Sequence, residues 1–176
     1  MSLPMPAPLP APLPAGVAID AETPADDAAV LALNEEAFGP GRHARAAARL
    51  RERGPHDRAL SFVARRGGEL VGSVRLTPIA VGGVPGHLLG PLAVVPVLKH
   101  HGIGRALIER SCVAASGAGD GRFVLLVGDA PYYARSGFAV VRGPLMPGPV
   151  DPARLLVRWH GAVEALAGPV RHAGDG

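Results

Sequence analysis

The sequence predicts a single mixed α/β domain with one strand–turn–helix crossover at its centre. Apolar residues make up 48% of the 176 residues, which is enough for one domain with a sizeable core. Strand-like and helix-like patterns follow one another along the chain, without an internal repeat. The segment Leu88–Val95 is continuously apolar and leads into a Gly-x-Gly helix start, so we expect it to be a buried central strand. This order of elements alone fits several folds.

The N-terminal part is predicted to hold a tail, one strand and two helices. Residues Met1–Gly16 are rich in regularly spaced proline, so we expect a disordered or polyproline-like tail that cannot form the helix of a signal peptide. No apolar run reaches the roughly 18 residues of a membrane span, and we expect a cytoplasmic protein. Thr23 is the expected N-cap of the first helix. The expected elements are the strand Val17–Asp20, the helix Pro24–Phe38 and the helix His43–Arg53.

The remainder is predicted to be mainly strands around one long helix. Arg66-Gly67-Gly68-Glu69 is a hairpin turn signal, and Val81–Gly86 is a second turn region. The expected elements are the strands Leu60–Arg65, Leu70–Pro78 and Leu88–Val95, the helix Gly104–Ser116, the strand Phe123–Val127, the short helix Ala130–Arg135, and the strands Phe138–Arg142 and Arg154–His160. The domain is expected over residues 17–168, with a flexible C-terminal tail at 169–176.

Composition limits the other classes of function. The formal net charge is +3, and arginines cluster between Arg42 and Arg66. We interpret this cluster as a solvated helix face; binding of an acidic partner or nucleic acid is the alternative, but no aromatic residues interleave with the arginines. Cys112 is the only cysteine, so it is expected to be a buried, inert thiol. The seven histidines lack metal-ligand spacing, and no metal site is expected.

The stretch Leu89–Leu107, LGPLAVVPVLKHHGIGRAL, is the most informative part of the chain. Its Gly-x-Gly, Gly102 to Gly104, opens a helix and would present unpaired backbone N–H groups and the positive end of the helix dipole to an anion, typically a phosphate. A dinucleotide-binding motif would need a third glycine where Leu107 stands, and the Gly-Lys-Ser/Thr ending of a P-loop is absent.

This stretch resembles the cofactor-binding motif of the GCN5-related N-acetyltransferases, the GNAT superfamily. A second stretch, Gly128–Phe138, resembles the family's short helix that carries Tyr-x-x-x-Gly-Phe. The two motifs together are most similar to the bacterial YhbS-type branch, and the resemblance covers Val17 to Gly168. It implies the GNAT acyl-CoA N-acyltransferase fold, with a central mixed sheet of about six to seven strands flanked by helices.

The resemblance implies that acetyl-CoA is the acyl donor. It would bind in a notch between the strands Leu88–Val95 and Phe123–Val127, which splay apart in the family. The residues that match the cofactor motif are Leu92, Ala93, Val94, Lys99, His100, His101, Gly102, Ile103, Gly104 and Arg105. The first motif position is usually Gln or Arg, and Lys99 keeps the charge but loses the planar fork, so we expect an effect on affinity.

The resemblance also implies direct transfer of an acetyl group to a primary amine of a small molecule or protein. Tyr133 matches the residue that protonates the leaving thiolate in many members; packing against the cofactor or the core is the alternative. The general base stays open, because the strand Phe123–Val127 has no carboxylate. The candidates are Glu35, Glu36, His87, Asp129 or water. The alternatives are a non-catalytic acyl-CoA sensor or scaffold and an arginine-rich nucleic-acid-binding module, and a homodimer is possible.

Overall fold

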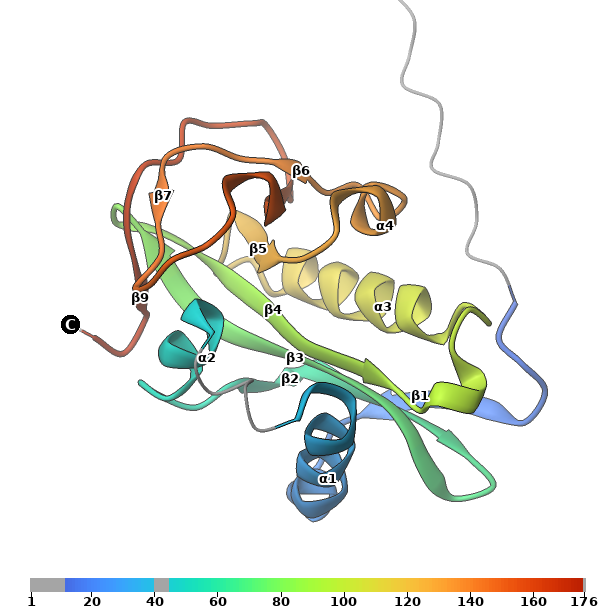
Figure 1. The fold of residues 1–176 in the computed structure, drawn as a ribbon. Helices are drawn as coiled ribbons and strands as arrows, with labels where there is room; N and C mark the ends of the chain where they lie inside the picture. The colour runs from blue at the N-terminus through green and yellow to red at the C-terminus, as the bar shows by residue number, and fades with distance from the viewer. Residues whose placement is uncertain (1–11, 40–44, 176) are drawn as a thin grey trace, which may run out of the picture.

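The computed structural model describes residues 12–39 and 45–175, which form a mixed sheet with helices on both faces (Figure 1). The strands of this part are β1 Val17–Ala21, β2 Asp57–Arg66, β3 Glu69–Val81, β4 Val84–Val94, β5 Phe123–Val127, β6 Ala139–Val140, β7 Pro144–Leu145, β8 Leu155–Trp159 and β9 Gly168–His172. Its helices are α1 Asp27–Phe38, α2 Ala46–Arg51, α3 Ile103–Ala118 and α4 Ala130–Ala134, with the 3-10 turns η1 Pro24–Asp26, η3 Pro96–Leu98 and η4 Pro152–Arg154.

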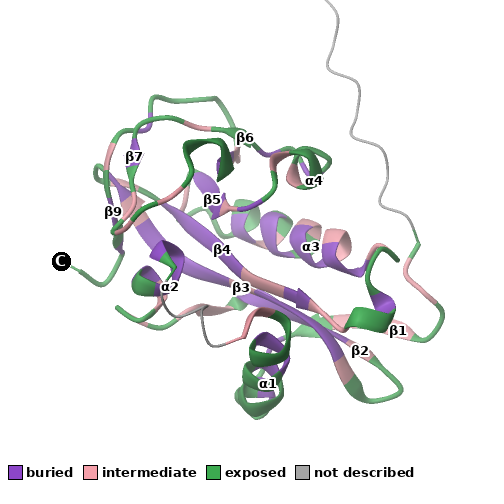
Figure 2. Ribbon diagram, in the orientation of Figure 1, coloured by how far each residue is buried: buried purple, intermediate pink, exposed green. Residues whose placement is uncertain are grey.

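The sheet has the order β1-β2-β3-β4-β5-β8-β6, and β9 pairs with both β3 and β7. Neighbouring strands are antiparallel except for β4 with β5 and β7 with β9. The helix α3 connects β4 to β5, which is the crossover that a parallel pair requires. The strand β4 lies inside the sheet, so the prediction of a central strand is confirmed, and much of β3 and β4 is buried (Figure 2).

Two hydrophobic clusters cover the sheet. One contains Ile103, Leu107 and Ile108 of α3, each at most 1% exposed. The other contains Ala47 and Leu50 of α2. Figure 1 shows α3 on one side of the sheet, with α1 and α2 on the other. Burying each large aliphatic side chain contributes about 1.5–3 kcal/mol, so both faces are held by their helices.

The parallel pair β4–β5 separates soon after it forms. Its backbone register includes only His87 with Val124 and Leu88 with Leu125. Beyond Leu88, β4 continues to Val94 along β3 without β5 on its other side. The splay implied by the family resemblance is therefore confirmed, and it leaves an open edge in the interior of the sheet.

Several expected bounds change in the structure. The expected turn Val81–Gly86 shrinks to Gly82-Gly83, because Val81 pairs with Val84 and both glycines take the positive φ of a tight hairpin. The strands β7 and β9 were not expected. The prediction of a flexible tail from residue 169 is wrong for Pro169–His172, since β9 pairs with β3 and buries Val170 to 3% exposure.

Two predictions near the N-terminus fall partly outside the described residues. Residues 1–11 of the expected tail lie there, whereas Leu13 packs against the cluster around α3, so the expected tail is too long. Residues 43–44 of the expected second helix also lie outside, and the observed helix is Ala46–Arg51. Within the described ranges, no helix is both long enough and apolar enough to cross a membrane.

Candidate functional site

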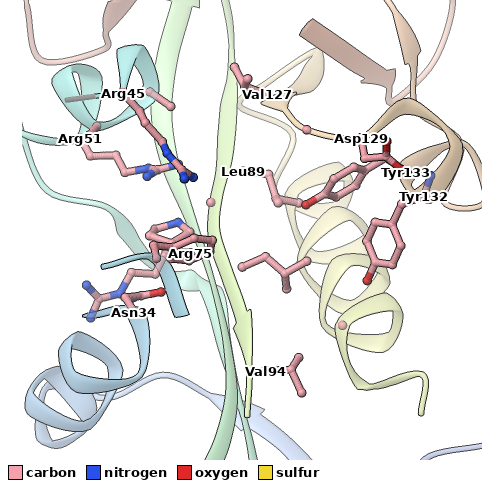
Figure 3. Close-up of a pocket in the computed structure, with 18 of the residues that line it drawn as sticks. Asn34, Arg45, Arg51, Arg75, Leu89, Val94, Val127, Asp129, Tyr132 and Tyr133 are labelled. Carbon is pink, nitrogen blue, oxygen red and sulfur yellow. Dashed lines mark hydrogen bonds between the residues drawn. The ribbon is translucent and has the colours of Figure 1, made fainter. Parts of the chain in front are cut away.

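A cavity of about 1440 Å³ opens where β4 and β5 separate (Figure 3). Its walls come from α1, α2, the second half of β4, the start of α3 and α4. The predicted site residues that line it are Leu92, Val94, Lys99, His100, His101, Gly102, Gly104, Arg105, Asp129 and Tyr133. The fold therefore brings the two sequence motifs together on one cavity.

Two predicted cofactor-binding residues point elsewhere. Ile103 is 1% exposed and packs in the cluster around α3. Ala93 is 4% exposed and pairs with Ser73 of β3. Neither residue is part of the cavity lining, so any contribution from them to binding would come from the backbone.

The start of α3 has the geometry of an anion site. Gly102 precedes the helix with φ 85°, and His100 with φ 67° is the one non-glycine residue with positive φ among those described. The first helical hydrogen bond runs from the Ala106 N–H to the Gly102 carbonyl at 3.0 Å. No described side chain caps this end, so the preceding N–H groups keep their capacity to bind an anion.

Tyr133 is held on α4 at the edge of the same cavity. Its ring lies against Gly128, where an added Cβ would come within 2.4 Å of Tyr133 Cε2. It also packs edge-on against Phe138, with ring centroids 5.9 Å apart. Burial raises the pKa of the Tyr133 phenol to about 12, against the opposite effects of Arg154 and Arg51. The phenol is therefore neutral near pH 7 and can donate a proton.

The four candidate bases are not equivalent. Asp129 lines the cavity, and its carboxylate accepts a hydrogen bond from the Tyr132 N–H at 3.2 Å as the N-cap of α4. Glu35 and Glu36 are exposed on α1 and are not among the lining residues. His87 is 2% exposed beside β5 and also lies away from the cavity. Only Asp129 is thus placed to contact a substrate there.

His87 belongs to a different group of side chains. One ligand atom each from Asp57, His87 and Asp120 lies within 4.8 Å of the others. Burial lowers the pKa of His87, and the two carboxylates partly oppose this effect. The grouping was not predicted, because the three residues come from separate segments without metal-ligand spacing.

The half of the cavity next to α1 and α2 includes residues of Glu35–Pro55, where the family resemblance implies an acceptor pocket, but its individual polar side chains were not predicted. Asn34, Arg45, Arg51, His56, Arg75 and Thr77 line it. Arg75 is neutralised there, since it donates to both oxygens of the buried Glu22 carboxylate, at 3.0 and 2.8 Å, and to Asp27 at 3.0 Å. Arg75 and Thr77 are polar residues that alternate with apolar ones along β3. This alternation was the one pattern in the sequence that could have indicated a polar wall on this side of the sheet.

The comparisons with known proteins agree with the geometry. The family model of an acetyltransferase (GNAT) domain matches residues 57–140. The structure of the GNAT family N-acetyltransferase YhbS from Escherichia coli, in complex with CoA, is 25% identical with a TM-score of 0.74, and the match covers 89% of each chain. A GNAT family acetyltransferase from Brucella melitensis, in complex with acetyl-CoA, is 29% identical with a TM-score of 0.67, covering 89% of this chain and 96% of the other. None of the curated proteins matches the sequence at a significant level.

Proposed function

We infer that this chain, a member of the GNAT acetyltransferase superfamily, transfers an acetyl group from acetyl-CoA to a primary amine. The observation that carries the proposal is the splay of β4 from β5, which opens onto the uncapped start of α3 and has Tyr133 at its rim. The two similar structures with CoA or acetyl-CoA bound support acetyl-CoA as the donor.

The residues around the splay fit such a donor. Leu92 and Val94 lie on the free stretch of β4, next to the start of α3, and would hold the pantetheine arm through their backbone. The first N–H groups of α3 and the Lys99 ammonium would hold the diphosphate. Arg105 donates to the Arg135 carbonyl at 3.1 Å, and its Nε is buried without a partner in the described structure. When bound, the donor supplies a thioester that an amine can attack.

The catalytic assignment follows from the protonation state of Tyr133. Its phenol carries a proton near pH 7 and would give it to the departing thiolate. A neutral amine would enter from the half of the cavity next to α1 and α2, and Asp129 or a water would take its proton. Direct attack needs no covalent intermediate on the protein.

A non-catalytic acyl-CoA sensor is the second candidate. It is favoured by one observation: β5 carries no carboxylate, and the only predicted base that lines the cavity already caps α4. This candidate predicts donor binding without acetyl transfer to any amine. The cytoplasmic location and a homodimer stay predictions from the sequence.

Calorimetric titration with acetyl-CoA and with CoA tests the proposal. We expect micromolar binding by the wild type and its loss in Gly102→Glu, which puts a carboxylate at the start of α3. Gly117→Glu is the matched control, because Gly117 lies near the other end of α3 with open space around it. Thermal unfolding of each variant shows whether it is folded. Absence of binding by the wild type would overturn the proposed function.

A further inference from the structure

We propose that the acceptor is an amine that also carries an anionic group, a carboxylate or a phosphate, and that Arg51 binds this group with Arg45 beside it. The inference rests on the proposed function and names the class of acceptor. It is argued from the charges in the half of the cavity next to α1 and α2.

Arg51 is a cation with no counter-ion among the residues that the structure describes. It is the last residue of α2, and its side chain reaches β4, where a Cβ on Gly90 would lie 2.5 Å from Nη2. Its Nε is buried and has no hydrogen-bond partner in the described part of the chain. Among the described carboxylates, none forms an ion pair with it. A guanidinium with a buried, unpaired Nε is costly, and a bound anion would offset this cost.

Arg45 increases the positive charge at the same place. Figure 3 shows the side chains of Arg45 and Arg51 reaching toward one another on one side of β4. Burial and the nearby Arg45 lower the pKa of Arg51 to about 10, so Arg51 remains a cation at neutral pH. An anion between them would relieve the repulsion and supply oxygen acceptors for both guanidinium groups.

Arg75, in the same cavity, is an arginine whose charge is balanced by carboxylates. It lines the same half, yet Glu22 and Asp27 neutralise it through three hydrogen bonds of 2.8–3.0 Å. The absence of an equivalent partner in the described structure distinguishes Arg51 from Arg75. An arginine that only stabilised the fold would be expected to have carboxylate partners, as Arg75 has. Arg51 therefore calls for another explanation.

The anion site and the proposed reaction centre share one cavity. Arg51 and Tyr133 both line it. Asn34, 3% exposed, lines the same half and has an amide oxygen without a described partner, which can accept from an N–H. Both features fit a molecule that carries an amine and an anionic group.

The phosphates of the donor are not the expected occupant. They are assigned to the start of α3, and Figure 3 shows α3 and Tyr133 on the opposite side of β4 from Arg45 and Arg51. An anion other than the donor phosphates is therefore needed to bind Arg45 and Arg51. The acceptor is the remaining substrate, so we assign this anion to it.

Calorimetry on the CoA-saturated protein tests this proposal without turnover. The probes are glycine, β-alanine and γ-aminobutyrate, each compared with its primary amide, and phosphoethanolamine compared with ethanolamine. We expect an anionic member to bind roughly tenfold or more tightly than its neutral partner, the strength of a charge-assisted hydrogen bond. Arg51→Gln should remove this preference and leave CoA binding unchanged.

Arg49→Gln is the matched control, because Arg49 lies on the same helix but donates to the Pro147 carbonyl and does not line the cavity. It should keep the preference. Tight binding of the carboxylates or of the phosphate identifies which anion the site takes. Equal or absent binding of charged and neutral probes, or a preference that survives Arg51→Gln, would overturn the inference. Weakened CoA binding in Arg51→Gln would also overturn it, by making Arg51 a donor contact. Failure of acetyl-CoA itself to bind would instead refute the proposed function.

Discussion

The hydroxyl oxygen of Tyr132 lies 2.6 Å from the position that a Cβ would take on Gly104. Gly104 is in the first turn of α3 and Tyr132 is on α4, so this approach joins the two sequence motifs. The sequence alone assigned Gly104 to the cofactor-binding motif. In the structure, the absence of a side chain at Gly104 also makes room for α4.

The first prediction tests that contact by a double-mutant cycle. Gly104→Ala should destabilise the protein by about 1 kcal/mol, because overpacking against the Tyr132 hydroxyl outweighs the helix propensity of alanine. In a Tyr132→Phe background the same change should stabilise by up to about 1 kcal/mol, since the other nearby atoms lie at 3.8 Å or beyond. Urea unfolding measures both values. Additive effects would show that the two side chains do not meet.

The second prediction concerns Tyr133. Tyr133→Phe should lower kcat about 100-fold or more with an amine that proves to be an acceptor, while the Kd for acetyl-CoA stays unchanged. The reason is loss of the proton donor, since the ring can keep its contact with Phe138. Steady-state release of the CoA thiol measures kcat, with Tyr132→Phe as the neighbouring control. An active Tyr133→Phe would assign thiolate protonation to another group.

The third prediction concerns the buried Glu22 carboxylate. Burial alone would raise the pKa of Glu22, but hydrogen bonds from His56 and Arg75 outweigh it and leave the pKa below the usual value. The resulting stability is present above the unfolded pKa of about 4.5 and is lost as the pH falls through the folded pKa. Glu22→Gln should cost about 3 kcal/mol at pH 7 and reduce the acid dependence.

Urea unfolding between pH 7 and pH 3 checks the Glu22 prediction. Glu69→Gln is the control, because Glu69 is exposed at the start of β3. An acid dependence that is the same in Glu22→Gln and in the wild type would refute the role of this carboxylate.

The fourth prediction concerns Cys112. Burial in the cluster around α3 raises the pKa of its thiol to about 12, so the thiol is neutral and shielded. A chromogenic disulfide reagent at pH 8 should not react with the folded protein and should react once in denaturant. The contribution of this thiol to stability should be full below about pH 9 and decrease as the pH rises toward 12. Rapid reaction of the folded protein would contradict the buried position.

The elements that local patterns describe were predicted well. Phe123–Val127 is the strand β5 with the expected bounds. A short apolar run between turn residues is typical of a buried strand, and the turn residues mark its two ends. Asp129 caps α4, and the local pattern Gly128-Asp129-Ala130-Pro131 favours such a cap. By contrast, β9 has few local signals, and it forms a strand only because Ile79, Ala80 and Val81 of β3 offer it an edge.

By itself, the sequence determined the order of strands and helices from β1 to β6, the glycine-rich start of α3 and the Tyr133 segment. Helix caps, turns and hydrophobic periodicity depend on residues that are near one another in the chain. They can therefore be predicted from the sequence alone. Only the tertiary structure decided that His87 lies away from the cavity while Arg51 reaches Gly90 inside it. Such contacts join residues far apart in the chain, and they depend on how α2 packs on the sheet and on where β4 separates from β5.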